Sequence, residues 1–318
     1  MSTITISGDG VRPLVLYGDC GEHETILREY DGWYDSPDCK VDLTERSGGD
    51  GAYDIPESRI LYAARTITIR YRLLPLGALD RSRLRALQEQ VNALLHRQVT
   101  VRVQDADRDL FAVGYVDSID VETTVDNVNR EYLNGQLNVV CPRPELRAMS
   151  MQSEQIRSDG NVRGGLQYGP GYYTYWEGTP NDSVSVLVTD TNYGHTGLHY
   201  PLTYGTRYDG RNICALHNRG DSRAYPVFTL TGRFADGVDL KLVTRDGSSH
   251  LTIGQPVDAT TPIILDTRSQ SVTRAGSDMS GLLSSRGWAT IPAGTSMSVA
   301  LMCAADGWVT CETHDTYM

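Results

Sequence analysis

Short runs in which apolar and polar residues alternate recur along almost the whole chain, and only one stretch carries the longer period of a helix. Successive side chains of a strand point to opposite faces, so strict alternation predicts strands that bury one face. In RTITIRYR, for example, Ile67, Ile69 and Tyr71 alternate with polar residues. The chain is therefore expected to be mainly β, with antiparallel sheets that cover a core on one side.

The N-terminal half combines these alternating runs with the helical stretch. Leu84, Leu87 and Val91 recur at helical spacing and predict a helix over residues 80–96, with Asp80 as its N-cap. The predicted strands lie in the segments ITISGDGVRPLVLYG, RTITIRYR, VTVRV, LFAVGYVDSIDVE and EYLNGQLNVVCP. We expect residues 1–150 to form a β-rich domain with one helix.

The C-terminal half repeats the strand pattern without a helical stretch. Residues 142–165 lose the alternation and carry prolines, charges and glycines, which places a domain boundary there. The 318 residues also exceed the length at which one core usually stops growing, which favours two domains. Seven short runs follow the boundary at the spacing of β-sandwiches, so residues 151–318 are expected to form two facing antiparallel sheets.

Charge and hydropathy exclude several classes of partner. The formal net charge of −11 argues against binding nucleic acid, which requires clustered basic residues facing phosphates. No apolar stretch is long enough to predict a membrane helix. The first residues, MSTITISGDG, lack the basic and apolar regions of a secretory signal, so we expect the protein to begin in a cytoplasm.

The six cysteines are widely scattered and include no CxxC pair. Such a distribution favours reduced, buried thiols over a zinc or redox site. Cys303 and Cys311 could lie on neighbouring strands, so a bond between them stays open.

Signatures of catalysis and metal binding are also missing from the sequence. There is no GxSxG elbow, no P-loop and no GxGxxG motif between a strand and a helix. His195 and His199 have the spacing of a helical metal pair, but Gly194 and Gly197 disfavour a helix. Asp105, Asp107 and Asp109 could attract calcium, yet a solvated hairpin turn explains them more simply. We predict a protein that is not an enzyme and has no cofactor and no metal site.

A set of segments in a fixed order carries the strongest functional signal. The N-terminal half contributes the glycine-rich GGDGAYDIP, the strand at residues 65–72, the helix at 80–96 and the meander at 99–141. The C-terminal half contributes HNRGDSRAYPVFTLTGRF, IILDTRSQSVTRAG and RGWATIPAGTSMSVAL, with Tyr225, Pro226, Gly232, Asp266, Arg274, Trp288, Pro292 and Gly294. Over nearly its whole length the chain resembles the distal tail protein family of siphophages. Ser296 stands where that family often carries Asn.

The resemblance implies a fold and a role. It implies an N-terminal domain of sheets, a helix and an extended hairpin, followed by a galectin-like or carbohydrate-module-like β-sandwich. It also implies a structural virion protein that forms a homohexameric ring at the distal end of a long non-contractile tail. The expected partners are other copies of the chain, the tail tube protein, and the tail-tip or tail-associated and receptor-binding proteins. The expected location is the tail tip of the virion, after assembly in the host cytoplasm.

Two sets of residues are candidate contact sites. An exposed strand edge can pair with a neighbouring copy and so close a ring, and we expect this around residues 65–72, with Arg65, Ile67, Ile69 and Arg70 at the interface. The alternative function is a host-glycan-binding module on the virion. In that case Tyr173, Tyr175 and Trp176 of the aromatic run YGPGYYTYWEG are expected to contact sugar rings, although alternation between core and interface is the favoured explanation of these residues.

Overall fold

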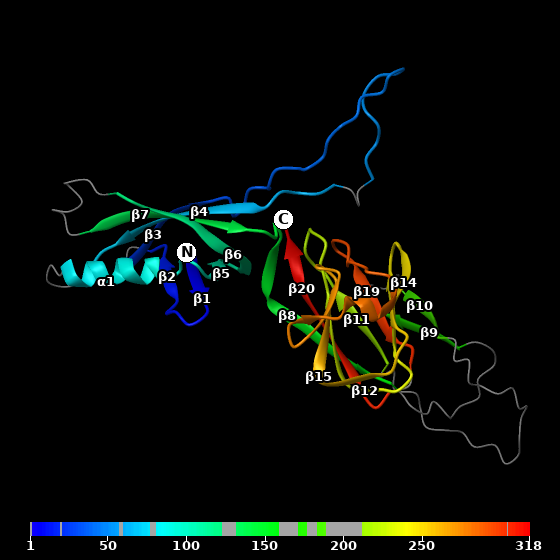
Figure 1. Ribbon diagram of the computed structural model, residues 1–318. Coiled ribbons are helices and arrows are strands. Elements are labelled where there is room, and N and C mark those ends of the chain that lie inside the picture. Colours follow the sequence, from blue (N-terminus) through cyan, green and yellow to red (C-terminus); the bar gives the residue numbers. More distant parts are fainter. Residues whose placement is uncertain are drawn as a thin grey trace, which may run out of the picture. The chain divides into compact units, whose positions relative to one another are not determined.

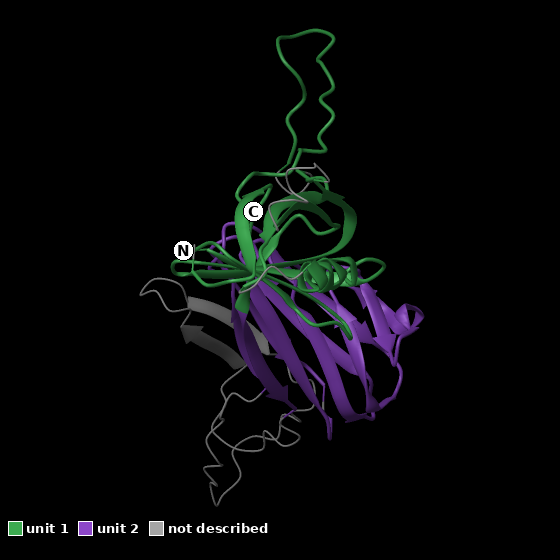
Figure 2. Cartoon of the chain, turned by 90° about the vertical axis from the view of Figure 1, so that its left-hand side faces the viewer, with its two compact units in different colours: residues 1–149, 317–318 green, residues 150–316 purple. Residues whose placement is uncertain are grey.

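The computed structural model describes residues 2–19, 21–56, 60–76, 81–122, 132–158, 171–176, 183–188, 212–303 and 305–318. These residues are mainly strands, which confirms the predicted fold class (Figure 1). The chain divides into two compact units. Unit 1 holds residues 1–149 with 317–318, and unit 2 holds residues 150–316 (Figure 2).

Unit 1 is a closed barrel. Its described strands follow the order β6-β5-β1-β2-β3-β4-β7, and β7 pairs again with β6 to close the circle. The strands are β1 (Thr3–Gly8), β2 (Leu14–Tyr17), β3 (Thr25–Asp31), β4 (Arg65–Leu73), β5 (Gln98–Asp105), β6 (Arg108–Val121) and β7 (Leu133–Cys141). Neighbours are antiparallel except β2 and β3, which meet in parallel at Tyr17 and Ile26. Closure leaves few backbone groups unpaired along the strands.

The alternation seen in the sequence becomes the barrel wall. In β4, Ile67, Ile69 and Tyr71 are fully buried, while Thr66 and Arg70 face outward. Each strand contributes its inward residues to one continuous core. The period-two pattern therefore predicted both the strands and their buried faces.

The predicted helix is present and shorter than expected. Helix α1 spans Arg81–Asn92 and buries Leu87 and Val91 in the barrel core. The chain then turns through i→i+3 hydrogen bonds and ends the turn at His96, whose φ of 60° no longer fits a helix. Asp80, the expected N-cap, lies outside the described residues.

Unit 2 contains two antiparallel sheets with a shared core. One has the order β17-β16-β15-β12-β20-β8, and the other has the order β11-β19-β13-β14-β18. The first comprises β17 (Ser277–Asp278), β16 (Ser271–Arg274), β15 (Val257–Asp266), β12 (Val227–Phe234), β20 (Trp308–Tyr317) and β8 (Leu146–Arg157). The second comprises β11 (Ile213–His217), β19 (Ser296–Leu301), β13 (Val238–Thr244), β14 (Gly247–Ile253) and β18 (Leu283–Arg286). A short 3₁₀ turn, η2 (Ser280–Leu282), precedes β18, and β9 (Gly171–Trp176) pairs with β10 (Ser183–Val188) as a hairpin.

The segment assigned to the domain boundary is partly a strand, which corrects the sequence analysis. β8 runs from Leu146 to Arg157, within the region predicted to lack regular structure. Most of its residues are exposed on both faces, so no apolar alternation marks it. It forms because β20 offers a partner for its backbone, and a single sequence does not reveal such a partner.

Candidate assembly surface

A long hairpin, which we call the arm (residues 36–63), projects from unit 1 (Figure 1). Its two sides are joined by isolated bridges, Cys39 with Tyr62 and Glu45 with Ala52. Backbone hydrogen bonds such as Lys40 N to Leu61 O, at 2.7 Å, continue the pairing between them. The arm is therefore an ordered ribbon along its described residues, 36–56 and 60–63.

The arm exposes large apolar side chains. Leu43, Tyr53 and Leu61 are 66%, 60% and 54% exposed, respectively. Apolar side chains gathered on a projecting ribbon are typical of a surface that another protein covers. The arm is also acidic, because Asp38, Asp42, Glu45, Asp50, Asp54 and Glu57 outnumber Lys40, Arg46 and Arg59.

Arg65 fastens the base of the arm to the barrel. Its side chain is only 2% exposed, and its Nε donates a hydrogen bond to the carbonyl of Pro144 at 2.7 Å. Its Nη1 donates to three carbonyls of the segment that leads into the arm, those of Gly32 at 2.8 Å, Trp33 at 2.9 Å and Asp35 at 2.7 Å. Burial lowers the pKa of Arg65 from its ordinary value, but a guanidinium stays protonated in proteins. One buried cation thus satisfies four backbone acceptors where the chain leaves the barrel.

The turn into the arm requires glycine. Gly32 has a φ of +77°, and a Cβ at this position would lie 2.0 Å from the carbonyl oxygen of Thr66. Trp33 follows with its side chain buried. The direction of the arm is therefore set by Gly32, by the burial of Trp33 and by the hydrogen bonds of Arg65.

A groove lies at the end of the barrel where β5 begins. Two adjoining depressions, of 380 and 400 Å³, share Arg97 and Gln98 in their lining. Tyr115, which is 47% exposed, lines the first of them beside His96. Within the described residues, β5 pairs with β6 only as far as Tyr115, so the backbone of β6 beyond that point has no partner on this side. The groove thus combines basic side chains, an exposed aromatic ring and a short stretch of open strand edge.

The strand predicted to form the ring interface, β4, has neighbours on both of its edges. It pairs with β7 from Arg65 to Leu73 and with β3 from Thr68 to Leu73. The predicted contacts Ile67 and Ile69 point into the core, and Arg65 is committed to the base of the arm. From Thr68 to Leu73 both edges of β4 are thus paired within the barrel, and a ring contact through Arg65, Ile67, Ile69 and Arg70 stays a prediction.

Arg70, the fourth predicted interface residue, is exposed on the outer face of β4. It contacts the carboxylate of Glu29 and donates a hydrogen bond to Gln136 at 3.3 Å. Thr68 donates a hydrogen bond to Asn138 at 2.9 Å, and Gln136 donates one to the same Asn138 oxygen at 3.3 Å. The outer face of the barrel wall is thus polar and internally hydrogen-bonded.

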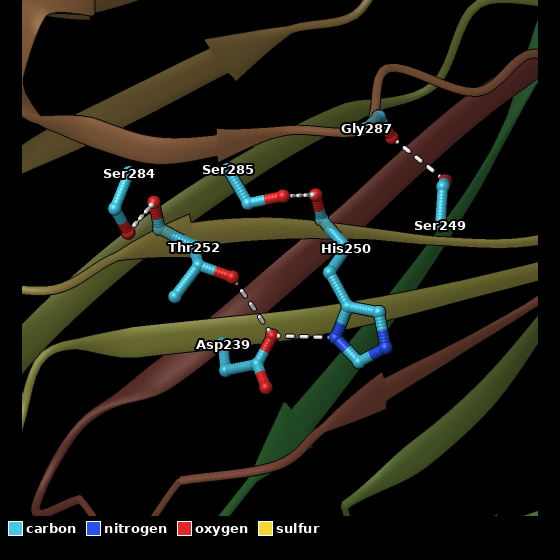
Figure 3. Close-up of polar contacts among 7 residues, drawn as sticks. All are labelled: Asp239, Ser249, His250, Thr252, Ser284, Ser285 and Gly287. Atoms are coloured by element: carbon cyan, nitrogen blue, oxygen red, sulfur yellow. Dashed lines mark hydrogen bonds and ion pairs between the residues drawn. The ribbon is translucent and has the colours of Figure 1, made fainter.

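A second polar network, in unit 2, holds one edge of a sheet together (Figure 3). His250 Nδ1 lies 2.9 Å from Asp239 Oδ1, across the β13–β14 pair. The hydroxyls of Ser284 and Ser285 on β18 donate to carbonyls of β14, at 3.1 and 2.9 Å. These bonds attach β18 where its pairing with β14 is irregular, so they account for the cluster as a structural support.

The acidic turn considered for calcium is a hairpin turn between β5 and β6. Asp109 Oδ1 and Oδ2 accept hydrogen bonds from Arg102 at 2.7 and 2.6 Å. Asp105 accepts from Tyr34 at 2.5 Å and from Ser2 at 3.0 Å. Across the part of the chain that the structure describes, no three His, Cys, Asp or Glu side chains gather into a potential metal site.

Other candidates from the sequence cannot be placed in a site. The backbone of Tyr173, Tyr175 and Trp176 lies in β9, but their side chains lie outside the described part of the chain, so the glycan alternative stays a prediction. His195 and His199 also lie outside the described residues. No helix among the described residues is long and apolar enough to cross a membrane.

The combination of a barrel carrying a helix and an arm, followed by a two-sheet unit, is a fold that a solved phage protein shares. The solved structure that carries this comparison is the Dit protein of phage SPP1, described as a paradigm of the hub adsorption apparatus in phages that infect Gram-positive bacteria. The two chains share 13% identity and a TM-score of 0.57, and the match covers 99% of each.

Two structures of the phage P2 baseplate in its activated conformation, one with Ca and one with Sr, also match. Each shows 11% identity and a TM-score of 0.48, with 98% of both chains covered. No family model matches the sequence, and no curated protein matches it.

Proposed function

We propose that the chain is a structural subunit of the hub at the distal end of a long, non-contractile phage tail. In this role it joins the tail tube to the tip and to the receptor-binding apparatus, and performs no catalysis. The shared fold with SPP1 Dit over the whole length of both chains supports the proposal. The subunit acts in the virion after assembly in the host cytoplasm.

The observation that carries the proposal is the arm. Exposing three apolar side chains to water on a projecting ribbon is energetically unfavourable for an isolated protein. Gly32 and buried Arg65 nevertheless hold the base of this ribbon in one direction. Such a device is suited to reaching another molecule in a fixed geometry. We assign that molecule as the next copy of the chain, so that repetition of one heterologous contact closes a ring, with six copies as the expected number.

The groove at the start of β5 is the receiving surface in this proposal. Its cationic residue, Arg97, suits the acidic arm, and Tyr115 offers an apolar surface to Leu43 or Leu61. The open edge of β6 beyond Tyr115 also allows backbone pairing with an extended segment. Charge, apolar surface and backbone pairing thus complement one another between the two surfaces.

The test is the size and symmetry of the purified protein. Light scattering across a concentration series and averaged negative-stain images are expected to reveal a closed ring for the full chain. In a second variant, a short Gly-Ser linker replaces residues 41–60. This variant is expected to be a monomer, and its far-UV circular dichroism spectrum should show that the barrel is still folded. Rings of the shortened variant would exclude the arm as the contact.

Point variants separate the arm from general surface effects. The double variant Leu43→Ser, Leu61→Ser is expected to associate at least tenfold more weakly. Each substitution removes an apolar side chain from the proposed interface between arm and groove. Ile264→Ser is the matched control, because Ile264 is also exposed but lies in unit 2. An equal loss of association in the control would contradict the assignment of the arm.

A further inference from the structure

Two cysteines of unit 2 face the same core from opposite sheets. Cys311 lies on β20, where it alternates with the buried residues Val309 and Thr313. Cys214 lies on β11 with the same orientation as buried Leu216, and it packs against the same hydrophobic core. Both thiols therefore face the interior between the two sheets.

The edge of the two sheets is drawn together beside these cysteines. Gln152 of β8 donates a hydrogen bond to the carbonyl of Ala215 at 2.8 Å and accepts one from the amide of His217, also at 2.8 Å. In this way a side chain of one sheet replaces a strand partner for β11 in the other sheet. β8 is also the neighbour of β20, as the 3.4 Å hydrogen bond from Ser153 to Glu312 illustrates.

The two thiols lie at the same core, and the neighbouring Cys214 thiol, together with burial, raises the pKa of Cys311 well above its ordinary value. Other described cysteines are differently placed. Cys141 is buried in unit 1, where burial raises its pKa to about 11, and Cys39 is exposed on the arm. The neighbour of Cys311 is thus Cys214, whereas the sequence had suggested Cys303.

We propose that Cys214 and Cys311 form a disulfide bond that joins the two sheets of unit 2 when the protein meets a disulfide oxidant. The structure holds both residues as free thiols, which suits folding in a reducing cytoplasm. The inference does not depend on the proposed function of the chain.

The order of the reaction follows from exposure. Cys214 is partly exposed, so its thiolate attacks one sulfur of an oxidant such as glutathione disulfide and releases one glutathione thiolate. Cys311 is buried, so it acts second: it loses its proton and attacks the Cys214 sulfur, which releases the second glutathione. Two protein thiols are oxidised by two electrons, and one disulfide is reduced to two thiols.

The bond is expected to stabilise unit 2 because it closes a long loop. Most of the chain of unit 2 lies between residues 214 and 311, and closing a loop of this length restricts the unfolded state strongly. We expect the unfolding temperature of unit 2 to rise by about 5–10 °C on oxidation.

The experiment uses the full chain carrying Cys39→Ser, which removes the exposed thiol of the arm as a source of bonds between molecules. The protein is incubated with glutathione disulfide, digested without reduction and mapped by mass spectrometry. A peptide pair linked through Cys214 and Cys311 is expected, together with a rise in unfolding temperature that dithiothreitol reverses. Adding Cys214→Ser or Cys311→Ala should abolish both effects, whereas adding Cys303→Ser should preserve them.

Three results would overturn the proposal. The first is a glutathione adduct that persists on Cys214 without a linked pair, and the second is a link from Cys311 to Cys303. The third is the absence of any modification after the protein has been held in oxidant near its unfolding temperature. If a double variant fails to fold, the peptide map of the Cys39→Ser protein, with and without dithiothreitol, decides by itself.

Discussion

At the scale of single residues, Arg65 shows how a charged side chain can be buried in a barrel with a hydrophobic core. Its position in the alternation of β4 points it inward, where an unpaired charge would be strongly unfavourable. Four backbone carbonyls accept hydrogen bonds from the guanidinium instead, and three of them belong to residues 32–35, which lead into the arm. A single side chain thus links barrel stability to the placement of the arm.

Replacing this arginine should therefore affect both properties. Arg65→Met is expected to lower the free energy of unfolding of unit 1 by about 2–4 kcal/mol, because it leaves buried carbonyls without donors. Urea unfolding measures this loss, and limited proteolysis should show faster cleavage within the arm. Arg70→Met on the same strand is the control, and its exposed ion pair should contribute less than about 1 kcal/mol. Equal effects of the two substitutions would show that the hydrogen bonds of Arg65 are not important.

At the scale of elements, the hairpin of β5 and β6 is stabilised by carboxylates. The hydrogen bond from Arg102 holds the pKa of Asp109 below its usual value of 3.8, and that from Tyr34 lowers the pKa of Asp105. A carboxyl whose pKa is lower in the folded state stabilises the fold above its unfolded pKa. That contribution is lost as the pH falls through the folded pKa.

Unit 1 should consequently lose stability as the pH falls below about 4. Because Asp109 and Arg102 are each about one-third exposed, the share of this pair is expected to be only about 0.5–1 kcal/mol. Asp109→Asn should flatten the pH dependence of urea unfolding in this range by that amount, while Asp117→Asn, at an exposed position of β6, should leave it unchanged. A steeper dependence in Asp109→Asn would contradict the assignment.

At the scale of the whole molecule, each unit has a core of its own. The barrel core is assembled from residues 1–149, and the core of unit 2 from residues 150–316. Two separate cores predict two units that can unfold separately. This expectation concerns the stability of each unit rather than their arrangement.

A substitution in one core should then leave the other unit protected. Phe228→Ala in unit 2 is expected to cost about 3–5 kcal/mol, because Phe228 is fully buried. Hydrogen exchange should show weaker amide protection across the strands of unit 2 and unchanged protection in β4 and β7. The reciprocal variant Ile67→Ala should weaken the barrel alone. A parallel loss of protection in both units would indicate one cooperative structure.

Much of the fold could be predicted because local patterns carried it. Alternating runs marked most of the long strands, and the period of Leu84, Leu87 and Val91 marked the helix. Strands without such a pattern were not predicted. β8 is exposed on both faces, and β3 and β11 are short and show no regular alternation of buried and exposed residues. The order of motifs along the chain also indicated the tail-hub fold, because that order is a property of the sequence alone.

The sequence by itself determined which residues face a core, since burial follows from the period of apolar residues along one strand or helix. It did not determine which strand edges remain open, because pairing depends on partners distant in the chain. Closure of the barrel paired both edges of β4 from Thr68 to Leu73, turned Arg65 inward onto the base of the arm, and left the arm and the groove exposed. The approach of Cys214 and Cys311 to one core likewise arises only when two sheets face each other. Only the tertiary structure decides these features, because each joins atoms that local sequence cannot bring together.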